Sequence, residues 1–186
     1  LVLTEEAQQF SQEFQLLSNN DGPFQWIAGL YYFKEDATRQ SRFFRSRYDV
    51  FATTFGVESG FDIGGQVDSE SVAVFGQGTS SLSDTLSLTA GLRYTDDEKE
   101  GTNLGFQFRG RPYADPVGDS WDELTYRLAL DWRMSDNVML FGSFSTGYKS
   151  GGINQVAALS LGATTAIYDP EFVDAIELGI KSTLLD

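Results

Sequence analysis

Four arginines stand close together in an otherwise acidic chain. Arg39, Arg42, Arg45 and Arg47 fall within nine residues and are interleaved with aromatic side chains. A guanidinium group can hold a carboxylate or phosphate through two parallel hydrogen bonds, so this cluster is suited to the capture of an anion. The alternative is an exposed extension of a strand, in which the arginines pair with nearby acidic side chains. Both interpretations remain open from the sequence.

Two further polar residues flank a glycine-rich segment. Lys149 and Asn154 lie on either side of Ser150-Gly151-Gly152, where a predicted strand ends. One interpretation places both side chains at a rim that a ligand reaches. The other is structural, because the glycines can bend the strand while Tyr148 anchors it at an apolar boundary.

The composition excludes several kinds of chemistry. The chain has 186 residues and contains neither histidine nor cysteine, which removes disulfides, thiol nucleophiles, Ser-His-Asp triads and most zinc or iron sites. No carboxylate pair stands in a recognisable catalytic motif, and the acidic run from Asp96 to Glu100 lacks the spacing of a calcium loop. A net charge of -14 argues against nucleic-acid binding. We therefore expect no enzyme, no metal and no cofactor.

The stretch from Leu124 to Lys149 shows how such side chains are positioned. Residues alternate strictly from Leu124 to Arg133, which predicts a strand with one apolar and one polar face. Ser135-Asp136-Asn137 has turn chemistry, and a second strand follows over 138–149. In water the apolar face requires a second protein layer, whereas in a membrane it can face lipid.

About seven such strands are predicted, with no helix. The others cover residues 7–17, 24–34, 69–82, 86–95 and 172–181. Short turns at 18–23, 83–85 and 135–137 alternate with long connections at 35–66, 96–118 and 151–167. Tight turns at one rim and long loops at the other are typical of an outer-membrane barrel. The predicted fold is all-β, an antiparallel up-and-down meander that forms an arc of a larger transmembrane β-barrel.

This fold predicts positions for the aromatic and the charged side chains. The aromatic residues near strand ends are expected to form two girdles at the membrane surfaces; they are Trp26, Tyr32, Tyr94, Trp121, Tyr126, Trp132 and Tyr148. The charged residues on polar strand faces are expected to point into the lumen and to form ion pairs there, with each other or with a plug inside the barrel; they are Arg93, Arg127, Asp131, Arg133, Glu177 and Lys181.

Several strings, in this order, resemble barrel strands of TonB-dependent receptors. They are residues 10–16 (FSQEFQL), 26–32 (WIAGLYY), 73–77 (AVFGQ), 88–95 (LTAGLRYT), 145–154 (STGYKSGGIN), 168–171 (YDPE) and 176–182 (IELGIKS). The resemblance implies a barrel of about 22 strands in the bacterial outer membrane, closed by an N-terminal plug. It also implies active, TonB-powered uptake of a scarce ligand, most often a ferric siderophore.

On this resemblance, residues 1–186 are an excised part of the barrel domain, without the plug and the remaining strands. The implied partners are outer-membrane lipid and lipopolysaccharide, the plug of the same full-length chain, TonB through the absent N-terminal region, and a ferric siderophore or other small ligand. The arginine cluster would then meet either an anionic chelate or lipopolysaccharide phosphates. A passive outer-membrane porin and a soluble carbohydrate-binding β-sandwich are the alternatives.

Overall fold

A computed structural model describes residues 2–43, 61–107, 111–153 and 167–183 of the chain. It contains one large sheet of seven antiparallel strands and a small pair, β7 (Gly152–Ile153) with β8 (Ile167–Tyr168). The strands of the large sheet are β1 (Val2–Leu17), β2 (Phe24–Phe43), β3 (Phe61–Ser81), β4 (Leu86–Gln107), β5 (Arg111–Ser135), β6 (Val138–Lys149) and β9 (Glu171–Ser182).

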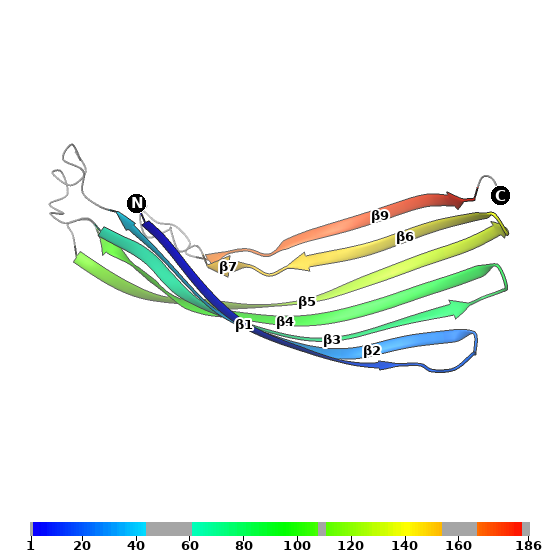
Figure 1. The fold of residues 1–186 in the computed structure, drawn as a ribbon, viewed down its shortest axis with the longest axis horizontal. Coiled ribbons are helices and arrows are strands. Elements are labelled where there is room, and N and C mark those ends of the chain that lie inside the picture. Colours follow the sequence, from blue (N-terminus) through cyan, green and yellow to red (C-terminus); the bar gives the residue numbers. More distant parts are fainter. Residues whose placement is uncertain (1, 44–60, 108–110, 154–166, 184–186) are drawn as a thin grey trace.

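The large sheet is a simple meander. Its strand order is β1-β2-β3-β4-β5-β6-β9, so each strand pairs with the next one along the chain. Figure 1 shows one open, curved layer in which the tight turns lie together at one end. The prediction of an all-β, up-and-down arc is confirmed. Within the described ranges, no helix is long and apolar enough to cross a membrane.

The register places residues of one parity on one face across the whole sheet. Phe14 lies opposite Leu30, Leu30 opposite Val74, and Val74 opposite Tyr94. The same parity continues through Leu128, which lies opposite Phe144. Because successive side chains of a strand point to opposite faces, the even-numbered residues form an apolar face and the odd-numbered residues form what we call the polar face.

The apolar face is uncovered. Leu178 is 82% exposed and Phe14 is 68% exposed, and the only buried hydrophobic residues among those described are Ala73 and Ala129. A contiguous apolar surface of this extent is not stable against water and marks a contact with lipid or another apolar layer. On β5 this belt runs from Leu124 to Trp132, close to the roughly 9–11 residues with which a tilted strand crosses a bilayer.

The strands are longer than the sequence pattern indicated. Strand β4 has 22 residues and β5 has 25. The prediction of a long connection at 96–118 was therefore wrong, since β4 and β5 continue as paired strands through most of that segment. In the segment 35–66, β2 and β3 continue as paired strands over 35–43 and 61–66, and the remaining residues lie outside the described part of the chain. The physical reason is that both faces are polar beyond the belt, so that the alternation that reveals a strand disappears. In Figure 1 these extensions reach far past β6 and β9.

The tight turns are held by side chains as well as by backbone. In the turn between β1 and β2, the Asn20 carboxamide accepts a hydrogen bond from the Gly22 amide at 2.9 Å. The Gln25 amide donates to the carbonyl oxygens of Asn20 and Gly22 at 2.7 and 3.0 Å. Such Asn and Gly residues favour the sharp reversal that a meander needs.

Candidate functional site on the polar face

The six charged residues predicted to point into a lumen share one face of the sheet. Arg127 lies opposite Gly91, Glu177 opposite Ser143, and Lys181 opposite Met139. Arg93, Asp131 and Arg133 have the same parity on β4 and β5. Among the described residues no ion pair joins two of the six, and their pairing with the plug stays a prediction.

Arg93 is fixed by aromatic rings rather than by an acid. Its Cζ lies 5.2 Å from the centre of the Tyr31 ring and 5.6 Å from that of Phe75. Its Nε also donates to the Thr95 hydroxyl at 3.2 Å. Cation–π contact over two rings holds a guanidinium in place while leaving part of its hydrogen-bonding edge free.

The rings themselves lie over glycines. A Cβ added to Gly29 would run into the Phe75 ring, and one added to Gly179 would run into the Phe141 ring. Lys181 Nζ lies 5.3 Å from the centre of that second ring. The pattern of glycine, covering ring and cation thus occurs twice on the polar face. It keeps the rings flat against the sheet and raises the cations above them.

A shallow, open hollow of about 320 Å³ lies beside Arg93. Gly91 is one of the residues that line it, and a Cβ added there would lie 3.4 Å from the Gln77 side chain. The polar residues that line it belong to four adjacent strands; they are Gln77, Arg93, Thr125, Arg127, Ser145 and Thr146. No acidic residue lines the hollow.

Beyond the belt, the connection after β6 folds back onto the polar face of β4 and β5. The Lys99 ammonium donates to the Gly151 carbonyl oxygen at 2.7 Å and lies 5.9 Å from the centre of the Trp121 ring. Gly151 and Gly152 are buried, and a Cβ on Gly151 would come 2.5 Å from that ring. Burial lowers the pKa of the Lys99 ammonium below its ordinary value, with Lys149 adding to this effect and Asp97 opposing it.

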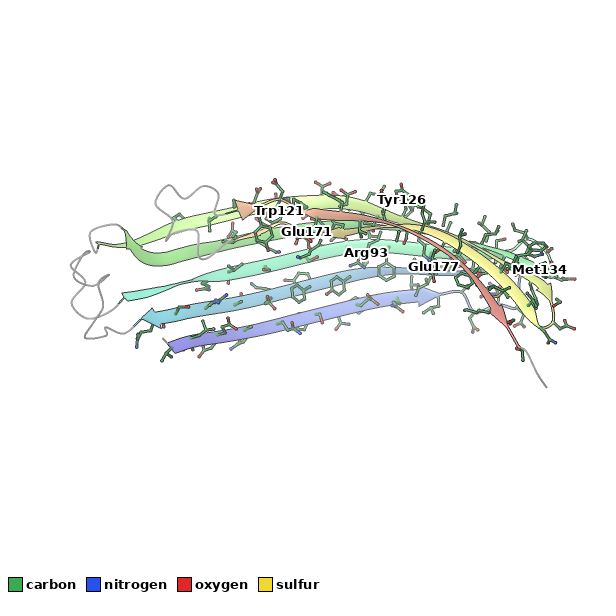
Figure 2. All side chains as sticks on the ribbon, turned by 90° about the horizontal axis from the view of Figure 1, so that it is seen from above. Arg93, Trp121, Tyr126, Met134, Glu171 and Glu177 are labelled. Carbon is green, nitrogen blue, oxygen red and sulfur yellow. The ribbon has the colours of Figure 1, made fainter. Side chains whose placement is uncertain are left out.

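This contact, which we call the Lys99 clamp (Lys99, Trp121 and Gly151), was not predicted. Trp121 was assigned to an aromatic girdle, but its odd position on β5 and its contact with Lys99 place it on the polar face. The Gly-rich segment therefore does more than bend a strand: it seats the β7–β8 pair against the sheet. In Figure 2, Trp121 lies toward the end opposite Met134 and the tight turns.

The residues predicted to bind ligand are only partly brought together. Arg39 Nε lies 3.3 Å from the Glu5 carboxylate, and Lys149 Nζ lies 3.5 Å from that of Glu171, with all four side chains largely exposed. Arg39 and Lys149 belong to β2 and β6, between which three strands intervene. Arg42 lies on β2 opposite Val2; Arg45, Arg47 and Asn154 lie outside the described residues.

On the apolar side, above the belt, acidic side chains gather. Asp36 lies opposite Asp68, Asp68 opposite Glu100, and Glu70 opposite Glu98. They line an open depression of about 250 Å³ together with Lys34. In the part of the chain that the structure describes, no group of acidic side chains is arranged to hold a metal ion.

Residues 3–186 match the family model described as TonB dependent receptor-like, beta-barrel. The chain belongs to this family. The resemblance seen in the strand sequences is thereby confirmed, and the two-faced meander is part of the wall of a TonB-dependent receptor barrel.

Solved structures of receptors agree with this TonB-dependent receptor fold. The ferric yersiniabactin uptake receptor FyuA from Yersinia pestis has a TM-score of 0.81 at 21% identity, covering 99% of this chain and 27% of that chain. The siderophore receptor PiuA from Acinetobacter baumannii has a TM-score of 0.72 at 15% identity, covering 98% of this chain and 30% of that chain. The ferric-catecholate import receptor Fiu from E. coli K12 has a TM-score of 0.63 at 11% identity, covering 98% of this chain and 28% of that chain. The TonB-dependent receptor sequence thus spans less than a third of each of these chains.

Proposed function

We propose that this chain is a section of the outer-membrane wall of a TonB-dependent receptor that imports a ferric siderophore. One observation carries the proposal: the even-numbered residues form the apolar face on all seven strands. The sheet therefore has one side suited to lipid and one side suited to a lumen. Residues 1–186 then lie within the barrel domain, and the plug and the other strands belong to the rest of the protein.

The substrate class rests on the relatives. The three similar structures are described as receptors for ferric yersiniabactin, for a siderophore and for ferric catecholate. Membership of the TonB-dependent receptor family supports the further proposals that uptake is coupled to TonB and that the protein lies in the outer membrane. The six charged residues of the polar face would then be lumenal.

The arginine cluster and the pair Lys149 and Asn154 are proposed to attract the anionic chelate at the outer mouth. Exposure of Arg39 and Lys149 supports this role, and both lie near the ends of β2 and β6 that lead into the predicted long connections. Contact of the arginines with lipopolysaccharide phosphates is the competing role.

The proposal is tested in the full-length receptor. Arg39, Arg42, Arg45 and Arg47 are changed together to Gln, and ferric-siderophore affinity is compared with that of the unaltered receptor in outer-membrane vesicles. We expect weaker binding with strong dependence on salt, because screening reduces the attraction of exposed charges. Unchanged affinity would contradict the ligand role.

Membrane partition and energy dependence separate the alternative functions. Recovery in the soluble periplasmic fraction would favour a carbohydrate-binding sandwich and contradict the barrel. Ligand entry that continues in cells lacking TonB would favour a passive porin. We expect recovery in the outer membrane and uptake that stops without TonB.

A further inference from the structure

The half of β5 that lies beyond the belt has a free edge. Strand β5 begins at Arg111, but its pairing with β6 begins only at Arg127. Where the two strands separate, the Tyr126 amide donates to the Thr146 hydroxyl at 2.9 Å instead of to a backbone carbonyl. Strands β7 and β8 pair with each other rather than with this edge. In Figure 1, β5 continues well past the end of β6.

The backbone groups on the free edge belong to the even-numbered residues of β5. The Arg133 amide donates to the Thr85 carbonyl oxygen beside β4, whereas the Tyr126 amide points toward β6. The register between β4 and β5 is unbroken from residue 111 to residue 132, so this alternation holds along the whole outer half of the strand.

Only part of this edge can accept another strand. Pro112 and Pro116 are both even-numbered, and a proline has no amide to offer, so the far end of the edge is closed to pairing. The Ser120 amide donates to the Asp119 carboxylate at 2.9 Å, which shows that it points outward. The remaining edge amides form no hydrogen bond with any described residue; they are those of Gly118, Asp122 and Leu124.

The surroundings of the open segment are acidic. Asp119, Asp122 and Glu123 lie on it, and none of them forms an ion pair within the described ranges. The base in the neighbouring row, Lys99, already donates to the Gly151 carbonyl oxygen. Further carboxylates lie opposite the segment on β4; they are Asp96, Asp97, Glu98 and Glu100. Unpaired backbone groups thus lie in a negative field that attracts cations.

This charge indicates what the edge accepts. The connection after β6, residues 150–167, contains no charged residue, and a second copy of the chain would bring a net charge of -14 and the same acidic edge. Neither matches the field of the segment. A basic peptide in the extended conformation matches both features, because its backbone can pair with the edge while its side chains meet the carboxylates.

We infer that residues 118–124 of β5 bind a basic, extended segment of another protein by strand addition. The segment pairs with the open backbone groups, and its basic side chains meet Asp122 on one face and Asp119 and Glu123 on the other. The prolines limit its length to about seven residues, at roughly 3.4 Å per residue. A protein partner goes beyond ligand import; only the position of this edge outside the cell rests on the proposed function.

Binding of a defined probe to the full-length receptor tests strand addition. The probe is a peptide of alternating lysine and valine, matched in length to residues 118–124, and the receptor is held in nanodiscs of phosphatidylcholine. We expect saturable binding that weakens with salt, and slower exchange of the backbone amides within residues 117–125. We expect no binding of a glutamate–valine probe, and no binding of a lysine–valine probe whose amides are N-methylated and cannot pair.

Asp122→Pro tests the backbone contact in the receptor itself. Proline removes the edge amide of residue 122 but no bond to β4, because the amides that face β4 belong to odd-numbered residues. Asp122→Ala is the matched control, since it loses the same carboxylate and keeps the amide. We expect the probe to bind Asp122→Pro roughly tenfold more weakly than Asp122→Ala. Amide exchange within residues 96–101 checks that β4 and β5 stay paired in both variants.

Several results would overturn the inference. Equal affinity of the two variants, or binding of the N-methylated probe, would show adhesion by charge without strand addition. Equal binding of the glutamate–valine probe would remove the charge selection. Slow exchange of the Gly118, Asp122 and Leu124 amides before the probe is added would show that the rest of the full-length chain, or a second copy, already covers the edge.

Membrane partition and siderophore uptake of the same receptor separate this inference from the proposed function. Normal partition and uptake without probe binding contradict the inference and leave the proposed function standing. Probe binding by a receptor that is absent from the outer membrane contradicts the proposed function and leaves strand addition standing.

Discussion

Single glycines decide where the aromatic rings of the polar face can lie. Phe75 covers Gly29 and Phe141 covers Gly179, each across a strand pair. A ring in this position replaces the side chain that glycine lacks and shields the backbone. The same rings support Arg93 and Lys181. A change of one methyl group at such a glycine should therefore disturb the ring and the cation together.

Gly29→Ala is expected to destabilise the receptor by about 1–3 kcal/mol, the usual cost of overpacking. Its Cβ would press on the Phe75 ring and come 2.8 Å from the Phe14 carbonyl oxygen. Gly76→Ala is the matched control, since its Cβ would meet only the Ile27 carbonyl oxygen, at 3.7 Å. The free energy of unfolding is measured by urea titration of the full-length receptor; equal values for both variants would contradict the role of Gly29 as a seat for the ring.

At the scale of elements, the β7–β8 pair depends on the strands beneath it. It has only two residues per strand, too few to be stable alone. Lys99 on β4 and Trp121 on β5 provide its attachment through Gly151. Burial at this attachment point also lowers the pKa of the Lys99 ammonium, because loss of water disfavours its charged form.

Lys99→Met is expected to release the β7–β8 pair. Methionine keeps most of the apolar side chain but ends one atom short of the ammonium and cannot donate to the Gly151 carbonyl oxygen. Amide exchange at 152–153 and 167–168 should therefore rise about tenfold, as expected for one charge-assisted hydrogen bond. Lys149→Met removes an exposed ion pair with Glu171, which is worth little. Exchange that rises equally in both variants would show that general loss of positive charge, not the clamp, is responsible.

The extended strands also make an element-scale prediction. The backbone amides of residues 96–101 and 117–122 that pair with each other in β4 and β5 should exchange as slowly as those of other paired strands. Hydrogen exchange of the full-length receptor, resolved by peptide, measures this directly. Rapid exchange over both segments would instead support the connection that the sequence pattern indicated.

The limits of the sequence pattern have a physical origin in these elements. The alternation from Leu124 to Arg133 predicted both the strand and its faces, because one face is apolar. Above Tyr94 both faces of β4 are polar, so Asp96 to Glu100 look like a loop although they form a strand. The face of Trp121 and the clamp depend on register and on a contact 52 residues apart, neither of which a local pattern contains. Arg93 and Arg127 were assigned to one face, but the ring support and the acid-free hollow required the structure.

At the scale of the whole molecule, the sheet separates two environments. Its apolar face bears large exposed side chains, while its polar face bears charges, rings and the β7–β8 pair. The belt is bounded by Trp132 near the tight turns and at the opposite side by Tyr94, which lies opposite Leu124. Aromatic residues at these depths are typical of the two surfaces of a bilayer. The height of a residue within the belt should thus determine how well a charge is tolerated there.

Leu128→Arg tests this prediction at the middle of the belt. Leu128 is 50% exposed on the apolar face of β5, so an arginine there would face the centre of the bilayer at a cost of about 2–4 kcal/mol. Ser120→Arg is the matched control on the same strand and face, but above the belt, where the cost should be close to zero. Folding of the full-length receptor into lipid vesicles under a urea gradient measures both values. Equal stability of the two variants would contradict the assignment of the apolar face to lipid, whereas a penalty confined to Leu128→Arg would place the bilayer between Trp132 and Tyr94.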